Sequence, residues 1–331
     1  MGCVLTRWLV FFLIVASLVS VVRIESASTA ESGASPPIQV WNRKTGELEV
    51  EHVYGDGLVR WAYETSLGRK ITDHLLSQPW LSRIYGYYQS SPLSVTQLEH
   101  FISEFKIPID DFQGAPYASF NDFFIRKFKP GKRPFVENSA RMAAFAEGRY
   151  LGYAQVPAAQ TLPVKGYHLS VRALLGDGPD VAVFQSGPVL IARLNPTDYH
   201  RFHFPDGGKI LRTYSISGSL QSVNPIALRH HEEILIQNER QISILETESF
   251  GKIAYIEVGA MGVGKIIQSH PVDQVFRRGD EKGYFLFGGS TVIIVGQSGL
   301  WKPDADLLKH TALGQETRIQ LGDAVGSLMS D

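Results

Sequence analysis

The sequence predicts an α+β protein, with a helical N-terminal part over residues 53–135 followed by a β-rich catalytic domain over residues 136–331. Between Gly55 and Tyr88, apolar residues recur at mostly helical spacing. From about Arg141 onward, short apolar runs are separated by Gly, Pro and Asp, which is typical of successive β-strands. The chain has 331 residues, of which 44% are hydrophobic, and it can therefore bury a large core.

Residues 1–26 are predicted to be a secretory signal peptide or an uncleaved membrane anchor. Arg7 precedes the apolar stretch WLVFFLIVASLVSVV, which is short for a membrane span, and small polar residues follow it. We therefore expect a protein of the secretory pathway or a membrane-associated one. The opening MGCVLT also fits a loose acylation pattern, in which Cys3 is open to a second acyl chain. Residues 27–52 are predicted to be a flexible leader.

Composition excludes several classes of function. The formal net charge is -1 and no basic run stands out, so we expect no nucleic-acid partner. Cys3 is the only cysteine, so a chain that has lost its signal peptide contains none. Internal disulfides, thiol catalysis and cysteine-ligated zinc are then excluded.

The helical part carries two segments that can be interpreted in more than one way. A helix is predicted around residues 94–105, with Ser94 as its N-cap and Gln97 three residues later. The aromatic segment SQPWLSRIYGYY belongs either to the core or to a lipid interface. The segment SFNDFFIRKFKPGKRPF presents either a solvated basic face or a site for an anionic head group. A phospholipid membrane surface is accordingly one expected partner.

A cluster of titratable residues lies in the segment LNPTDYHRFHFPDGG, which includes Asp198, His200 and His203. On a strand, the two histidines would face opposite ways, whereas a turn would direct both imidazoles into one pocket. The Asn-Pro context favours the turn. Three interpretations are open: structural histidines, a zinc site, or acid–base catalysis in which an aspartate orients an imidazole.

Ser290 follows Gly288 and Gly289 between two apolar runs that are predicted to be strands. A Gly-Gly-Ser sequence in this position is most often a simple hairpin turn. The glycines nevertheless remove side-chain bulk beside the carbonyl of Gly289, so that the serine can attack its own preceding carbonyl. The elbow motif of serine hydrolases is absent, because position 292 is valine.

Several separated motifs resemble the phosphatidylserine decarboxylase family, in its form with a GGST cleavage site. The resemblance runs from about Val53 to about Val295. It is carried by SFNDFFIRKFKPGKRP, DYHRFH, VNPIA, QNERQ, IEVGAMGVGKI, RRGDEKGYF and FGGSTVI, which stand in the family's order. The resemblance implies an enzyme that decarboxylates phosphatidylserine to phosphatidylethanolamine, with no metal.

The resemblance also implies how the enzyme matures. A proenzyme would cleave itself between Gly289 and Ser290, after His203 takes the proton of the Ser290 hydroxyl. The products would be a β chain ending at residue 289 and an α chain whose first residue has become a pyruvoyl group, the electron sink of the decarboxylation. His200 would then protonate the decarboxylated product, and Asp198 would orient one of the histidines. Members of this family often pair, so a homodimer is expected.

One position departs from the family pattern. Glu147, in the segment AFAEGRY, stands where the family has an aspartate that partners the histidine of the cleavage triad. Its extra methylene displaces the carboxylate, so self-cleavage is expected either to be slow or to use Asp198 as the alternative acid, and Glu147→Asp is expected to speed it. Two alternatives to the main interpretation follow. In the first, the chain is a decarboxylase of a free, for example aromatic, amino acid. In the second, it is a binding homologue that never matures.

Overall fold

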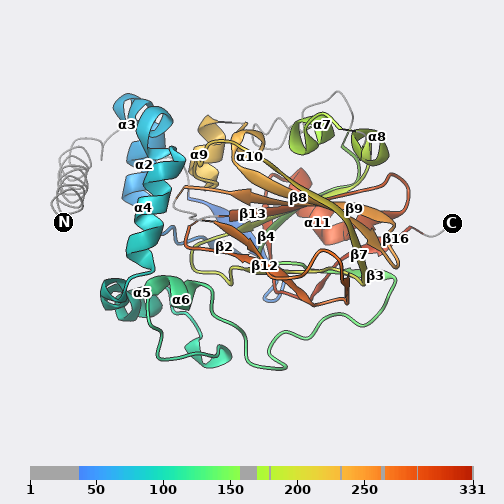
Figure 1. The fold of residues 1–331 in the computed structure, drawn as a ribbon, viewed down its shortest axis with the longest axis horizontal. Helices are drawn as coiled ribbons and strands as arrows, with labels where there is room; N and C mark the ends of the chain where they lie inside the picture. Colours follow the sequence, from blue (N-terminus) through green and yellow to red (C-terminus); the bar gives the residue numbers. More distant parts are fainter. Residues whose placement is uncertain are drawn as a thin grey trace.

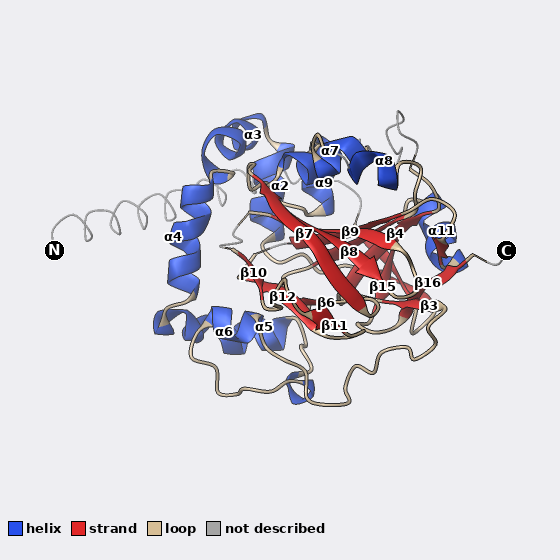
Figure 2. Cartoon of the chain, turned by 45° about the vertical axis from the view of Figure 1, so that its right-hand side comes forward, coloured by secondary structure: helices blue, strands red, loops and turns tan. Residues whose placement is uncertain are grey.

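The computed structural model describes residues 37–156, 170–178, 180–231, 233–261, 265–288 and 290–329 (Figure 1). The signal peptide or anchor predicted over residues 1–26 lies outside the described residues. Within them the protein has the predicted mixed α+β character. Figures 1 and 2 show a group of helices at one end of a large, twisted sheet.

The helical N-terminal part is confirmed, although its helices are short. Ser94 does not begin an α-helix. It lies in a 3₁₀ turn over Pro92–Gln97, and its hydroxyl accepts a hydrogen bond of 2.8 Å from the amide of Phe120. Among the described residues, no helix has the length and apolar character that a membrane crossing needs. The α-helices of this part are α2 (Asp56–Glu64), α3 (Ser66–Ile71), α4 (Pro79–Gln89), α5 (Leu98–Glu104) and α6 (Phe120–Phe124), and a π-helical turn, Thr72–Leu76, follows α3.

The β-rich part is built around one ten-stranded sheet. Neighbouring strands are antiparallel throughout, except for the parallel pair β1 and β15. In spatial order the strands are β11 (Val275–Phe276), β7 (Gly208–Ile216), β8 (Arg240–Thr247), β9 (Lys252–Gly259), β13 (Ser290–Gly296), β5 (Val189–Leu194), β4 (Gly148–Tyr153), β15 (Glu316–Ile319), β1 (Gln39–Asn42) and β2 (Glu47–Val50).

Two small sheets, five further α-helices and a 3₁₀ turn over Ile109–Asp111 complete the described structure. One small sheet has the order β10 (Ile266–Gln268), β12 (Glu281–Phe285), β6 (Arg201–His203), and the other β14 (Trp301–Pro303), β16 (Ala324–Leu328), β3 (Arg141–Ala143). The helices are α7 (Val171–Leu175), α8 (Asp180–Phe184), α9 (Pro225–His230), α10 (Ile234–Gln237) and α11 (Ala305–Ala312).

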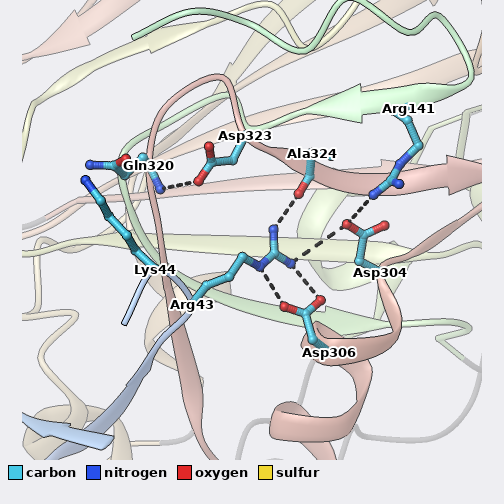
Figure 3. Close-up of a pocket in the computed structure, with 8 residues that line it drawn as sticks. All are labelled: Arg43, Lys44, Arg141, Asp304, Asp306, Gln320, Asp323 and Ala324. Carbon is cyan, nitrogen blue, oxygen red and sulfur yellow. Dashed lines mark hydrogen bonds and ion pairs between the residues drawn. The ribbon is translucent and has the colours of Figure 1, made fainter. Parts of the chain in front are cut away.

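Residues 39–50 form β1 and β2, where the sequence predicted part of a flexible leader. β1 pairs in parallel with β15, which comes from the far end of the chain. The side chain of Arg43 then reaches Asp306 of α11 at 2.6 Å (Figure 3). Two strands of four residues carry almost no local signal, and their stability comes from partners that are distant in sequence.

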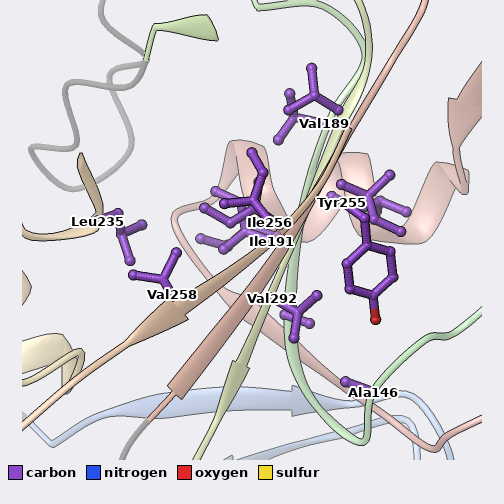
Figure 4. Packing of buried hydrophobic residues seen from close by; sticks show 14 of the residues in the cluster. Ala146, Val189, Ile191, Leu235, Tyr255, Ile256, Val258 and Val292 are labelled. Atoms are coloured by element: carbon purple, nitrogen blue, oxygen red, sulfur yellow. The ribbon is translucent and has the colours of Figure 1, made fainter. Parts of the chain in front are cut away.

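The main hydrophobic core covers both faces of the large sheet. Figure 4 shows Leu235 of α10 beside Val258 of β9 on one face, and Tyr255 and Val292 directed to the other. The central strand β13 is buried along its whole length. Burial on both faces explains why this strand is a continuous apolar run instead of an alternating one.

A second, aromatic cluster joins the helical part to the β-rich part. It includes Phe101, Phe120 and Phe124 of the helices together with Phe287, two residues before position 289. Many aromatic side chains of the helical part are therefore core. Arg126, from the predicted basic face, is also buried, and it donates to the carbonyls of Thr197 and Asp198.

Candidate active site

Ser290 is the first residue of β13 and lies between two neighbouring strands, opposite Leu194 of β5 and Gly259 of β9. Its side chain is fully buried, and its Oγ has no hydrogen-bond partner among the described residues. A buried hydroxyl without a partner is unfavourable and calls for an explanation. Gly288 has a φ of 141°, a backbone conformation that favours glycine. Gly289, the other half of the predicted cleavage site, lies outside the described residues.

The register of the sheet decides where the Ser290 side chain points. Side chains two residues apart on a strand share a face, as do residues directly opposite on neighbouring strands. Ser290 therefore shares a face with Val292, and Val292 lies opposite Glu257. On that face, the Nζ of Lys282 of β12 lies 2.6 Å from Glu257 Oε1. The Ser290 side chain thus points into the layer between the large sheet and the small sheet β10-β12-β6.

His200 lies beside the strand that leads to the predicted cleavage site. Its carbonyl accepts a 3.0 Å hydrogen bond from the amide of Phe285, and its ring centroid is 3.8 Å from that of Phe124. Nδ1 lies 3.1 Å from the carbonyl oxygen of Asp198, whereas Nε2 is buried without a partner among the described residues. Complete burial lowers the pKa of His200 well below its ordinary value, so this imidazole is neutral near pH 7.

His203 is held differently, because both of its ring nitrogens have partners. Nδ1 lies 2.9 Å from the carbonyl oxygen of Gly279, and Nε2 lies 3.1 Å from the hydroxyl of Tyr199. Burial lowers the pKa of this imidazole too. The preceding Phe202 packs toward the large sheet, with its ring centroid 6.2 Å from that of Tyr255. His203, one residue along the strand, therefore faces away from that sheet.

The predicted turn occupies Asn195–Asp198, but the chain then enters β6 before it reaches His203. The contacts of the two imidazoles do not overlap in the part of the chain that the structure describes. The turn was predicted to direct both imidazoles into one pocket. That prediction is wrong, because the two rings share no contact among the described residues. The strand, and not the turn, decides the direction of the second imidazole.

The carboxylate of Asp198 does not contact either histidine. It forms a buried ion pair with Arg149 and accepts a 2.7 Å hydrogen bond from the amide of Asn195. Arg149 in turn pairs with Glu51 at 2.8 Å. Although burial alone would raise the pKa of Glu51, Arg193 and Arg149 lower it to about 2. Among the described residues, Asp198 contacts a histidine only through its main-chain carbonyl, which lies 3.1 Å from His200 Nδ1.

Glu147 is also engaged elsewhere. Its two carboxylate oxygens accept hydrogen bonds of 2.6 Å and 2.9 Å from Arg133, and a third of 3.3 Å comes from the amide of Leu321. No contact between Glu147 and His203 is present among the described residues. The resemblance assigns the carboxylate of Glu147 to His203, but in the structure this carboxylate is paired with the guanidinium of Arg133.

Glu257 and Lys282 were not singled out by the sequence analysis. Both side chains are buried, and they form the 2.6 Å ion pair on the Ser290 face of the large sheet. The available signal was a single carboxylate within the strand KIAYIEVG, which is apolar between its first residue, Lys252, and Glu257. A buried charge needs a partner, so this residue type within such a strand indicates an unusual site.

A surface pocket of about 520 Å³ lies elsewhere, where the end of β1 approaches α11 (Figure 3). Besides the pair between Arg43 and Asp306, its walls hold Arg141, 2.7 Å from Asp304. None of the predicted site residues lines it. Among the described residues, no group of three or more His, Cys, Asp or Glu side chains is arranged to hold a metal ion.

Comparison with known proteins bears on most of the chain. A protein-family model described as phosphatidylserine decarboxylase matches residues 120–327. A phosphatidylserine decarboxylase proenzyme of Clostridium perfringens (strain SM101) is 37% identical over 296 residues, covering 87% of this chain and 99% of that protein. Proenzymes of the same name from Desulfitobacterium hafniense and Chlamydia pneumoniae are 37% and 38% identical, each over 87% of this chain and over 98% and 96% of their own lengths.

Proposed function

This chain belongs to the phosphatidylserine decarboxylase family, and we propose that it converts phosphatidylserine to phosphatidylethanolamine and carbon dioxide after cutting itself between Gly289 and Ser290. The relatives named above are proenzymes, which supports a maturation step. The observation that carries the proposal is the buried, unpartnered hydroxyl of Ser290, which directly follows two glycines.

Self-cleavage requires only groups of the chain itself and water. Oγ of Ser290 loses its proton and attacks the Gly289 carbonyl carbon, and the amide C–N bond breaks as its nitrogen takes up a proton. The result is an ester between the two residues. A nucleophile fixed next to its target needs no bimolecular encounter, which favours this step. Elimination across the Cα–Cβ bond of residue 290 then releases the upstream chain as a carboxylate. Water finally replaces the amine as ammonia and leaves the pyruvoyl group.

Residue 290 fits the pyruvoyl group well. It is buried at the start of the inner strand β13, and Gly259 opposite it places no side chain on the shared face. When present, the group supplies a carbonyl that accepts electron density from the decarboxylating carbon. The surrounding chain would hold the substrate and exclude water, because every residue of β13 is buried.

We propose that the two histidines divide the proton transfers as the resemblance implies. His203 would take the hydroxyl proton of Ser290, for which its imidazole must separate from the Tyr199 hydroxyl and turn from its present direction to face the large sheet. His200, whose Nε2 is unpartnered, would protonate the decarboxylated carbon. The neutral state of buried His200 requires that it first acquire this proton during turnover. Asp198 would support His200 through its carbonyl, and Glu147 would support the site through Arg133.

The helical part offers a surface for a phospholipid membrane. On α4, Trp80, Arg83 and Tyr87 are exposed at spacings of three and four residues, which places them on one helical face. Trp80 is 49% exposed and Tyr87 is 75% exposed. Aromatic rings next to a basic side chain suit the head-group region of a bilayer. We propose that this face contacts the membrane that carries the substrate.

The first experiment is an intact-mass measurement of the purified chain, with a denaturing gel. The wild type should give two fragments, of which the smaller begins at position 290 with a blocked N-terminus. Ser290→Ala should remain whole, whereas Ser243→Ala, a matched buried serine on β8, should cleave normally. A well-folded wild type that stays whole after long incubation would end the proposal and favour a binding homologue.

The second experiment identifies the substrate. The matured protein is offered phosphatidylserine in vesicles or free amino acids, and carbon dioxide release is measured. Trp80→Ala/Tyr87→Ala should weaken vesicle binding and lipid turnover together, whereas Val275→Ala, a control at an equally exposed site on β11, should change neither. Turnover of free aromatic amino acids, with none of lipid, would replace phosphatidylserine as the substrate.

A further inference from the structure

Glu257 of β9 and Lys282 of β12 form a buried ion pair that the chemistry above does not use. The side chains are 0% and 1% exposed, and Lys282 Nζ lies 2.6 Å from Glu257 Oε1. The second oxygen, Glu257 Oε2, is buried and has no hydrogen-bond partner among the described residues. An ionised carboxylate in such surroundings normally uses all of its acceptor capacity, so the free oxygen indicates a group that it meets only during the reaction.

The side chain that carries the free oxygen lies on the same face of the sheet as Ser290, two positions along the register. Glu257 is opposite Val292, and Ser290 is opposite Gly259. Glu257 and Ser290 are therefore diagonal neighbours on adjacent antiparallel strands, a separation that a long side chain can span. Gly259, which would otherwise place a side chain beside them, has none. Within the described part of this face, Glu257 is thus the carboxylate nearest to residue 290 by register.

The surroundings hold this carboxylate in place and make it a stronger base. Burial raises the pKa of Glu257 and lowers the pKa of Lys282. Lys282 also donates to Gln268 Oε1 at 2.8 Å, and Gln268 Nε2 donates to Gln241 Oε1 at 2.8 Å. These polar contacts run from the buried pair to Gln268, the exposed last residue of β10, and on to Gln241 of β8; Figure 2 shows β10 beside β12. The lysine is therefore fixed. Glu257 is anchored through Oε1, and Gln268 is near enough to its carboxylate to act against the rise of its pKa, while Oε2 accepts no hydrogen bond of normal geometry from the described residues.

Self-cleavage needs two proton removals, and the histidine assignment covers one. The hydroxyl proton leaves when the ester forms, and the α-hydrogen of residue 290 leaves in the elimination. We propose that Glu257 is the base that removes this α-hydrogen, with Lys282 as the positioning residue that holds its carboxylate. The inference rests on the self-cleavage proposed above and adds a residue to its second stage.

The proposed step balances without an external oxidant or reductant. Glu257 takes the α-hydrogen as a proton, and the electron pair of that C–H bond forms the Cα–Cβ double bond. The Cβ–Oγ bond breaks, and its electron pair leaves with the new carboxylate of Gly289. Water then converts the resulting enamine to a ketone and ammonia. Cβ gains one proton as it becomes a methyl group, and this balances the proton that Glu257 has taken up.

The test follows the ester, which has the same mass as the uncut chain but is split by hydroxylamine. Glu257→Gln should slow release of the small fragment at least about a hundredfold, the usual share of a general base. The uncut chain that accumulates should yield fragments with hydroxylamine, and the small one should begin with serine. Ser290→Ala, which cannot form the ester, should resist hydroxylamine.

Two further variants separate this role from stability. Because Glu257→Gln leaves a buried lysine charge unpaired, Glu257→Met/Lys282→Met removes both charges and is expected to fold with an unchanged thermal midpoint. It should accumulate the same ester. Glu316→Gln, a buried carboxylate paired with Arg193 on the opposite face, should cleave at the wild-type rate.

Each outcome decides the matter. A folded Met/Met variant that cleaves at the wild-type rate would overturn the role of Glu257 and leave the proposed function intact. Uncut Glu257→Gln and Met/Met chains that both resist hydroxylamine would also overturn it, because the block would then precede the ester. A wild type that never cleaves would refute the proposed function itself.

Discussion

The carboxylate of Asp198 pairs with Arg149 in the protein interior, and only its main-chain carbonyl reaches the neighbouring His200. Arg149 lies opposite Arg193 on β5, and so it faces away from the side of the sheet that carries Ser290. Asp198 therefore contributes two different groups. Its carboxylate holds the turn against Arg149 on one face of the sheet, and its main-chain carbonyl contacts the imidazole of His200.

The first prediction concerns that anchor. Asp198→Ala should lower the free energy of unfolding by about 3–5 kcal/mol, because it removes one of the two carboxylate partners of the buried Arg149 charge. Chemical denaturation measures the loss. Asp177→Ala, which removes the carboxylate of an exposed pair with Arg172, should change little. A negligible effect of Asp198→Ala would show that Glu51 alone compensates the guanidinium.

The two histidines should be separable by experiment. His203→Ala should slow self-cleavage at least about a hundredfold. His200→Ala should still cleave but lose decarboxylation by a similar factor, as measured by carbon dioxide release from the matured fraction. His100→Ala, on an exposed face of α5, serves as the control. If His203→Ala yields fragments and His200→Ala yields none, the two roles must be exchanged. His200, whose Nε2 has no partner among the described residues, would then be the base for Ser290.

Glu147→Asp should not speed maturation, despite restoring the residue type of the family pattern. The shorter side chain can no longer accept both hydrogen bonds from Arg133, so stability should fall by about 1–2 kcal/mol. The time course of fragment release on a denaturing gel checks this. Faster cleavage than the wild type would mean that a carboxylate at this position does reach His203, as the sequence alone suggested.

Stability should fall as the solution becomes acidic. Burial lowers the pKa of His200 and of His203 in the folded chain, whereas both titrate near pH 6.5 when unfolded. Below about pH 6.5 the unfolded chain therefore binds more protons than the folded chain. The free energy of unfolding should drop by up to roughly 1.4 kcal/mol per pH unit for each histidine. His200→Gln should have a shallower dependence between about pH 6.5 and 5.5, and an identical slope would contradict the assignment.

The two fragments should remain together after cleavage. β13 pairs with β5 on one side and β9 on the other, and β15 lies between β4 and β1. The pairs Arg43–Asp306 and Arg141–Asp304 also join residues on opposite sides of the cut. Native size-exclusion chromatography should give one peak that contains both fragments, and denaturant should be needed to separate them. Loss of the small fragment under native conditions would show that the sheet opens on cleavage.

Local patterns in the sequence determined much of this molecule. Short apolar runs between glycines and prolines predicted the strands, and helical spacing predicted the helices before residue 135. The order of motifs around His200, His203 and Ser290 indicated the family, which the comparisons confirm. These signals survive in the sequence because they depend on neighbouring residues: turn chemistry, periodicity and backbone freedom are properties of a few consecutive positions.

The tertiary structure alone decided which groups meet. Strand β1 pairs with β15 from the far end of the chain, and β2 pairs with β1. Asp198 forms an ion pair with Arg149, and Glu147 forms one with Arg133. The placement of Glu257 beside Ser290 followed from the register of β9 against β13. Ion pairs and strand pairing join residues that are distant in sequence. A buried charge must be paired, and the fold decides which residue lies close enough to pair with it. Residue spacing along the chain therefore does not predict which distant groups pair.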